Sequence, residues 1–313
     1  MQPLFLKPVF KERIWGGKAS QQEFGHEIPF DKTGECWAIS AHPNGPSIIE
    51  NGPYAGRTLD QLWKEHPELF GNPKRKDFPL LTKILDANMD LSIQVHPNDN
   101  FAKVNENEES GKTECWYIID CKKDSNMIFG HNAKTKKELT RYINDGEWDN
   151  LLRSVKIKQG DFFFVPSGTI HALCEGTLVL EIQQSSDTTY RIYDYDRKDG
   201  DGNLRELHLD KAIEVITVPH QDPENVTTIE TKENVTITTF IESDFFSVYK
   251  WDINGNAIFS NDNKYLLISV INGEGSLVYN GEQYSLSKGT HLIIPVGIRR
   301  FNVNGSCELI VTH

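Results

Sequence analysis

The sequence predicts a mainly β protein whose strands form a sandwich or a barrel. Short β-prone segments separated by Gly, Pro and Asn dominate the chain, and strands do not alternate regularly with helices. A second observation is an internal repeat, because the spacing Gly-x5-Pro-x-Gly occurs from Gly160 and again from Gly289. The repeat predicts two structurally related units within one chain.

The predicted strands concentrate in a few places. β-branched and aromatic residues are enriched in 36–41, 79–95, 115–119, 161–165 and 177–183. The last part of the chain, 235–313, is again rich in strand-forming residues. Within it, the Gly-rich sequence 272–275 predicts a hairpin turn rather than a phosphate-binding loop.

Helical patterns are short and few. Thr58 is a suitable N-cap for a helix over 58–65, and Thr135 followed three residues later by Glu predicts a helix over 135–144. A further turn is predicted at 148–154, and another short helix at 210–214. These helices accompany the strands without forming a repeated strand-helix unit.

The length of the chain predicts two domains, since 313 residues exceed the usual size of one. The polar segment 218–233, with two prolines, has the composition of a connection. We therefore expect a larger domain over 1–232 and a smaller one over 233–313. The sequence leaves the oligomeric state open between a monomer and a homodimer.

Charge and cysteine content narrow the possible partners. The net charge of -12 argues against a nucleic-acid surface. The five cysteines form no CxxC motif or dense framework, which indicates reduced thiols. Because the sequence shows no secretory leader and no apolar stretch of about 18 residues, we expect a cytoplasmic protein without a membrane partner.

The most informative motif runs from Gly160 to His171, with the sequence GDFFFVPSGTIH. It reads as a strand that stops at the turn Pro166-Ser167-Gly168 and presents a histidine just beyond. A histidine placed in this way is suited to bind a metal ion.

Two more segments carry residues of the same chemistry. In SIQVHP, the period of a strand places Ser92, Gln94 and His96 on one face, and in GKTEC it does the same for Lys112 and Glu114. Each of these residues alone is commonly structural. Together with His171 they favour a site for Zn²⁺ or another divalent first-row ion, with an open position for water or substrate.

The motif from Gly160 to His171 resembles the second conserved motif of cupins, which are small jelly-roll barrels that hold a metal. More specifically, the chain resembles type I phosphomannose isomerases of the short microbial form. The matching segments are RIWGG (13–17), GECWAIS (34–40), PLLTKILDANMDLSIQVHP (79–97), GKTECWYII (111–119), PSGTIHAL (166–173) and EIQQSSDTTYRIYDYDR (181–197).

The resemblance implies two cupin-like jelly-roll barrels with a few short helices. Only the first is expected to hold a metal, because the position matching His171 in the repeat is Arg300. The implied activity interconverts mannose 6-phosphate and fructose 6-phosphate with one Zn²⁺ per chain. The implied zinc ligands are Gln94, His96, Glu114 and His171, and the implied residues of the sugar-phosphate pocket are Lys83, Ser92, Lys112, Glu181 and Arg191.

The chemistry suggests roles for the residues that are not metal ligands. Arg191 stays protonated, so it can stabilise negative charge or hold an anion but cannot act as a base. Glu181 lies among apolar residues, where burial raises the pKa of a carboxyl group and suits it to proton transfer. Lys112 is expected beside the metal, and Trp15 as a wall of the pocket.

Each role has a structural alternative. Arg191 could be a surface residue paired with Asp187 or Asp194, and Lys83 could keep an edge strand soluble. Glu181 could be paired with a buried cation, and Trp15 could belong only to the core. The identity of the catalytic base therefore stays open.

Two other functions are compatible with the ligand set. An Fe²⁺-dependent cupin oxygenase also uses two histidines and a carboxylate, and a sugar-binding protein with two cupin units could carry a structural metal. The basic residues Lys83, Lys112 and Arg191, together with Gln94, favour an anionic substrate and therefore the isomerase.

Overall fold

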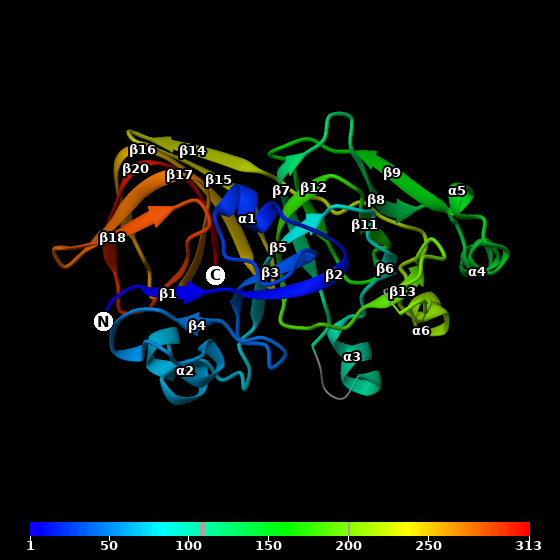
Figure 1. Ribbon diagram of the computed structural model, residues 1–313, viewed down its shortest axis with the longest axis horizontal. Coiled ribbons are helices and arrows are strands. Elements are labelled where there is room, and N and C mark those ends of the chain that lie inside the picture. The colour runs from blue at the N-terminus through cyan, green and yellow to red at the C-terminus, as the bar shows by residue number, and fades with distance from the viewer. Residues whose placement is uncertain (107–109, 200) are drawn as a thin grey trace.

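The computed structural model describes residues 1–106, 110–199 and 201–313. Most of the described elements are strands, which form three sheets that lie side by side along the long axis of the molecule (Figure 1). The prediction of a mainly β protein with few helices is confirmed. In their hydrogen-bonding order the sheets are open rather than closed into continuous barrels.

The six-stranded sheet carries most of the charged residues discussed below. Its order is β10-β7-β12-β5-β3-β2, and all its neighbours are antiparallel. The strands span β2 Val9–Gly17, β3 Thr33–Ser40, β5 Leu80–Ala87, β7 Glu114–Cys121, β10 Phe162–Val165 and β12 Thr177–Gln184. Because β5, β12 and β7 are central, their side chains are buried on both faces.

A five-stranded sheet lies next to it, with the order β13-β6-β11-β8-β9. The strands are β6 Ile93–Val95, β8 Asn126–His131, β9 Leu152–Lys156, β11 His171–Leu173 and β13 Tyr190–Tyr193. The two sheets contact each other where the ring of Trp116 on β7 meets the ring of His171 on β11, with centroids 5.2 Å apart. Residues of both sheets therefore meet in the space between them.

The nine-stranded sheet contains the C-terminal strands and two strands from the N-terminus. Its order is β14-β15-β16-β20-β17-β19-β1-β4, with β18 paired to β17. The strands are β1 Leu4–Lys7, β4 Ile48–Ile49, β14 Thr228–Lys232, β15 Val235–Glu242, β16 Ser247–Ser260, β17 Leu266–Tyr279, β18 Glu282–Ser287, β19 His291–Ile294 and β20 Arg300–Thr312. Segments on both sides of residue 232 thus contribute to this sheet, and the domain division stays a prediction.

The helices are short and lie around the sheets (Figure 1). They are α1 Ala19–Phe24, α2 Leu59–Glu65, α3 Asp99–Asn105, α4 Lys136–Asp145, α5 Trp148–Leu151 and α6 Leu209–Val215, with 3-10 turns at Gly52–Tyr54 and Pro67–Phe70. Thr58 caps α2 as predicted and forms a capping box with Gln61, and Thr135 caps α4 by accepting from the amide of Glu138. None of the described helices is long and apolar enough to cross a membrane.

Three local predictions are wrong. The turn predicted at 148–154 is helical only to Leu151, since 152–156 pairs with β8 as a strand. Part of the expected connection, 228–232, is the strand β14. The sequence 272–275 lies inside β17, where the register shifts at a bulge after Val270, and the turn comes at Asn280 and Gly281 instead.

Candidate metal centre and active-site cavity

Three buried ligands converge between the five-stranded and six-stranded sheets. His96 follows β6, Glu114 begins β7 and His171 begins β11. Their ligand atoms all lie within 4.8 Å of one another. Nε2 of His96 is 3.5 Å from Oε2 of Glu114, and Nε2 of His171 is 3.3 Å from Oε1 of the same carboxylate.

The turn before His171 explains how the sequence delivers it to this place. Gly168 has a φ of +84°, and a Cβ at this position would lie 2.6 Å from the side chain of Thr217. Only glycine fits such a left-handed and crowded position. The amide of Gly168 donates to the carbonyl of His96 at 2.9 Å, which ties the turn to the second histidine.

Backbone carbonyls fix which nitrogen of each imidazole carries the proton. Nδ1 of His96 donates to the carbonyl of Thr188 at 2.9 Å, and Nδ1 of His171 donates to the carbonyl of Thr169 at 2.8 Å. Burial lowers the pKa of His171 to about 4 and, together with the charge of Lys112, lowers the pKa of His96 well below its ordinary value. Both Nε2 atoms therefore offer a lone pair at neutral pH.

The carboxylate and the amide at this site also fit a cation. Glu114 is fully buried, and among the described residues neither of its oxygens accepts a hydrogen bond; Oε2 has an ion pair with Nζ of Lys112 at 3.0 Å. Such a group is costly unless a cation compensates it. Nε2 of Gln94 lies 3.3 Å from Nε2 of His171, so a half-turn of the amide brings its oxygen to the same position.

Next to these ligands, charges of alternating sign cross the six-stranded sheet. Nζ of Lys112 lies 3.7 Å from Oε1 of Glu181, and that oxygen is 3.6 Å from Nζ of Lys83. Lys83 is in turn 3.8 Å from Oε2 of Glu35, whose other oxygen accepts from Nε of Arg13 at 2.8 Å. The series leads from the metal ligands toward solvent, where the side chain of Arg13 is 32% exposed.

The two residues closest to the ligands have shifted pKa values. Burial raises the pKa of Glu181 above its ordinary value despite the nearby lysines. Although burial opposes charge on Lys112, the carboxylates of Glu114 and Glu181 raise its pKa. Nε1 of Trp116 donates to Oε2 of Glu181 at 3.2 Å, whereas Oε1 accepts no hydrogen bond from the described residues. Lys112 is therefore positively charged, and Oε1 is the free oxygen of Glu181.

A cavity of about 370 Å³ opens onto this series. The structure brings together on its lining every residue that the sequence predicted for the pocket besides the ligands, namely Trp15, Lys83, Ser92, Lys112, Glu181 and Arg191, and Gln94 lines it as well. Trp15 belongs both to the wall and to the core around Leu85. Lys83 lies on the central strand β5, so its alternative role on an edge strand is wrong.

Arg191 is not paired with an acidic side chain. Its Nε donates to Oγ of Ser92 at 3.3 Å and its Nη1 to the carbonyl of Glu206 at 2.8 Å. No described carboxylate lies within ion-pair distance of it, since Asp194 is bound by Arg197 and Arg205 instead. The structural alternative, in which Arg191 pairs with Asp187 or Asp194 at the surface, is therefore wrong.

Sequence reasoning missed Arg13, Glu35 and Arg205, all of which line the cavity. Glu35 gave the same signal as Glu181, a carboxylate inside an apolar strand, and could have been found by it. Lys83 and Arg13 lower the pKa of Glu35 to about 2 against the effect of its burial. Arg205 lies in an irregular segment and gave no such signal.

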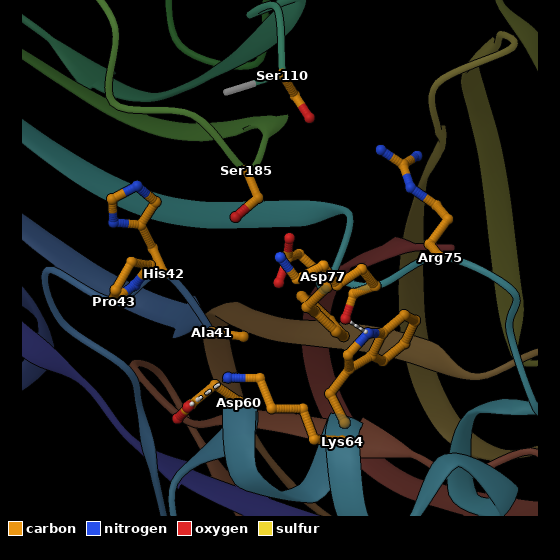
Figure 2. Close-up of a pocket in the computed structure, with 12 residues that line it drawn as sticks. Ala41, His42, Pro43, Asp60, Lys64, Arg75, Asp77, Ser110 and Ser185 are labelled. Atoms are coloured by element: carbon orange, nitrogen blue, oxygen red, sulfur yellow. Dashed lines mark hydrogen bonds and ion pairs between the residues drawn. The ribbon is translucent and has the colours of Figure 1, made fainter. Parts of the chain in front are cut away.

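A second and larger cavity, of about 460 Å³, is shown in Figure 2 and shares none of its lining residues with the first. Ser110 and Ser185 point into it, whereas Lys112 and Asp187, two residues further along, line the first cavity. The two segments that carry these residues, 110–113 and 184–187, are joined by hydrogen bonds between Thr113 and Gln184. No metal-ligand cluster of the described residues lies there, so the first cavity is the candidate active site.

The C-terminal unit holds no such cluster either. Residues 233–313 are all described, and the one group of His, Cys, Asp and Glu ligands found lies outside them. Arg300, at the position that matches His171, is exposed.

Comparisons with known proteins agree with this geometry. The family model described as phosphomannose isomerase type I, catalytic domain, matches residues 4–123, and the one described as mannose-6-phosphate isomerase, cupin domain, matches 236–313. The chain is 57% identical over 312 residues to a mannose-6-phosphate isomerase of Bacillus subtilis, covering 100% of this chain and 99% of the relative. It is 50% identical over 313 residues to the Streptococcus mutans enzyme, covering 100% and 98%.

Solved structures agree as well. The crystal structure of the mannose 6-phosphate isomerase from Bacillus subtilis superposes with a TM-score of 0.99 at 55% identity and covers 100% of both chains. A putative mannosephosphate isomerase from Archaeoglobus fulgidus has the same fold, with a TM-score of 0.76 at 21% identity, covering 100% of this chain and 98% of the other.

Proposed function

The chain belongs to the type I family of mannose-6-phosphate isomerases, and we propose that it interconverts D-mannose 6-phosphate and D-fructose 6-phosphate by zinc-assisted proton transfer through a cis-enediol. The observation that carries this proposal is the contact between the buried ligand cluster and a buried lysine-carboxylate pair. Nζ of Lys112 lies 3.0 Å from Oε2 of Glu114 and 3.7 Å from Oε1 of Glu181. One ammonium group therefore contacts both a proposed metal ligand and the proposed proton-transfer group.

His96, Glu114, His171 and the turned amide of Gln94 would hold one Zn²⁺ per chain. Two neutral imidazoles and a carboxylate match a ligand set that zinc uses in catalytic sites. When bound, the ion supplies a Lewis acid that polarises the oxygens on C1 and C2 of the sugar.

Glu181 moves the proton between C2 and C1 of the open-chain sugar. In a cis-enediol both carbons present the same face, so one base serves both transfers. The hydrogen bond from Trp116 holds Oε2 of Glu181, which leaves Oε1 to accept and return the proton. Its raised pKa brings the carboxyl group closer to the pH at which it works.

Lys112 stabilises the negative charge that develops on the sugar oxygens, whereas Arg191 acts on the charge that the substrate already carries. Lys112 is buried and charged, so its ammonium acts at short range without reorganising solvent. Arg191 and Ser92, which are hydrogen-bonded to each other, bind the anionic substrate. Lys83 orients Glu181, and Trp15 forms an apolar wall against the sugar ring.

Two observations argue against the other functions considered. A binding protein with a purely structural metal predicts a filled site, whereas a cavity of about 370 Å³ is lined here by Gln94 and by Lys112, which pairs with Glu114. An oxygenase of an apolar substrate predicts an apolar lining, whereas five cationic residues, Arg13, Lys83, Lys112, Arg191 and Arg205, line this one. The partner that this lining fits is a sugar phosphate.

The same proposal bears on the cellular location and the oligomeric state of the protein. The five cysteines are free in the structure, as expected for a cytoplasmic protein, and a cytoplasmic location stays a prediction. A monomer and a homodimer both remain compatible with the chain.

The proton-transfer step is tested by running the reaction in D₂O and stopping it before equilibrium. A base that is shared between C1 and C2 exchanges with solvent during turnover, so we expect deuterium at C1 of the fructose 6-phosphate. Fructose 6-phosphate that carries no deuterium from solvent, under conditions in which a base-catalysed control does carry it, would indicate a hydride shift. That result would overturn the cis-enediol step.

A further inference from the structure

The cationic residues of the active-site cavity differ in how far carboxylates already neutralise them. Lys83 and Lys112 each contact two carboxylates, and Arg13 is paired with Glu35. Arg191 has no carboxylate within ion-pair distance among the described residues, and Arg205 shares its carboxylate with another arginine. A dianionic group is therefore attracted most strongly toward Arg191 and Arg205.

Arg205 is held rigidly by one side of its guanidinium group. Its Nε lies 2.6 Å from Oδ2 of Asp194 and its Nη2 2.5 Å from Oδ1. This contact is bidentate, which fixes the plane of the group. Among the described residues no acceptor binds Nη1 of Arg205, so this nitrogen keeps its donors for a ligand. The side chain is 20% exposed and lines the cavity.

The single negative charge of Asp194 faces two positively charged partners. The same carboxylate accepts from Nε and Nη2 of Arg197 at 2.9 and 2.7 Å, so two guanidinium groups share a single negative charge. Burial opposes ionisation of Asp194, but the hydrogen bonds from Arg205 and Arg197 hold its pKa below the ordinary value. The carboxylate is therefore charged and serves as a brace.

Arg191 is repelled by the positive charge that Asp194 leaves unbalanced. Burial and repulsion by Arg205 lower the pKa of Arg191 from its ordinary value, with Asp194 and Glu206 acting in the opposite direction. Two guanidinium groups that repel each other across a cavity gain when an anion binds between them. In a hexose 6-phosphate the phosphate is at the end of the molecule away from C1 and C2, so it lies away from the metal ligands.

We propose that Arg205 is a second phosphate-binding residue beside Arg191, that Asp194 positions it, and that this pair selects phosphorylated over unphosphorylated sugars. The proposal rests on the proposed isomerase function and deepens it. Phosphate oxygens accept well from guanidinium groups, and a planar group fixed on one side loses little entropy when it binds.

Arg197 offers a matched control. Like Arg205, it makes two hydrogen bonds to Asp194, but it does not line the cavity, and its Nη1 donates to the carbonyl of Asp90. Arg205→Gln and Arg197→Gln each remove one of the two guanidinium groups that bind the carboxylate of Asp194. Only the first removes a donor that faces the substrate.

The test measures steady-state kinetics with mannose 6-phosphate and competitive inhibition by inorganic phosphate. For Arg205→Gln we expect KM and the inhibition constant of phosphate to rise roughly 10- to 100-fold with kcat changed by less than about threefold, since a phosphate contact binds substrate and transition state alike. Arg205→Lys should recover part of the affinity. Arg197→Gln should leave both constants within about threefold of the wild type.

Equal losses in Arg205→Gln and Arg197→Gln would overturn the proposal, because the effect would then come from the loop around Asp194. Unchanged phosphate inhibition in Arg205→Gln would overturn it as well. Failure of the isomerase proposal is distinguishable: a wild-type protein without turnover still allows direct titration with inorganic phosphate, in which Arg205→Gln is expected to bind at least tenfold more weakly.

Discussion

Lys83 and Glu181 are direct cross-strand partners on β5 and β12, and Nζ of Lys83 lies 3.6 Å from Oε1 of Glu181. Both side chains are only 4% exposed. A slip of either strand by one residue would send its side chain to the opposite face of the sheet and separate the pair. The register of the six-stranded sheet therefore holds a lysine at the proposed catalytic carboxylate.

The first prediction concerns the stability of this buried pair. Lys83→Met removes the cation that lies between Glu35 and Glu181 and leaves two buried carboxylates facing each other. We expect the free energy of unfolding to fall by about 3–5 kcal/mol, as for other broken buried pairs. Urea unfolding measures the change. The double variant Lys83→Met/Glu181→Gln should regain part of the loss, and a single-variant loss below about 1 kcal/mol would contradict the pairing.

The second prediction concerns the proton-transfer group. Glu181→Gln keeps the shape of the side chain but cannot accept a proton, so we expect kcat to fall by roughly 10²- to 10⁴-fold with little change in KM. Steady-state kinetics measures both constants. Glu35→Gln is the control, because it also removes a carboxylate beside Lys83. Comparable losses of kcat in both variants would assign the effect to Lys83 rather than to a base at Glu181.

The third prediction concerns the metal ligands. His171→Gln removes one of the two imidazoles, and we expect bound zinc to fall from about one per chain to well below half and activity to be lost with it. Metal analysis of the purified protein measures the stoichiometry. His131→Gln changes another buried histidine, which donates to the carbonyl of Thr217 and does not belong to the cluster. Zinc retained by His171→Gln, or lost equally from His131→Gln, would speak against the assigned ligands.

The fourth prediction concerns pH and a histidine outside the active site. Burial lowers the pKa of His291 on β19 to about 3, and its Nδ1 hydrogen-bonds to Oγ of Ser269. Between pH 6.5 and 3 the unfolded chain binds a proton that the folded protein excludes, so stability falls as the pH falls. Above pH 7 the group contributes nothing to the pH dependence.

This shift corresponds to a loss of roughly 2 kcal/mol between pH 7 and pH 5. Urea unfolding of the wild type and of His291→Asn at these two pH values isolates it. We expect the pH-dependent loss to be smaller in His291→Asn by about that amount. The same pH dependence in both proteins would show that His291 is not held neutral in the folded state.

The candidate metal cluster could be predicted from the sequence because its signals are local. A strand, a turn that needs Gly168 and then His171 follow one another in the chain, and the alternation of a strand places Gln94 beside His96. Local geometry of this kind is encoded within a few residues. The cavity residues required more, since the meeting of Lys83 with Glu181 depends on the register of two strands almost a hundred positions apart.

The remaining features depend on tertiary context. Arg205 lies in an irregular segment, and nothing in the sequence places it beside Asp194 or the cavity. Residues 152–156 become a strand because β8 pairs with them, which overrides the helical start at Trp148. The glycines at 273 and 275 lie within a long strand just after the bulge that follows Val270, and composition alone does not distinguish such a strand from a turn.

The central claim is that the first cavity is the active site of a metal-dependent mannose-6-phosphate isomerase. The most direct measurement is coupled conversion of mannose 6-phosphate to fructose 6-phosphate before chelation, after chelation, and after zinc is restored to the stripped protein. We expect activity to disappear with the metal and to return with zinc. Full turnover by the metal-free protein, or no turnover with about one zinc per chain, would contradict the claim.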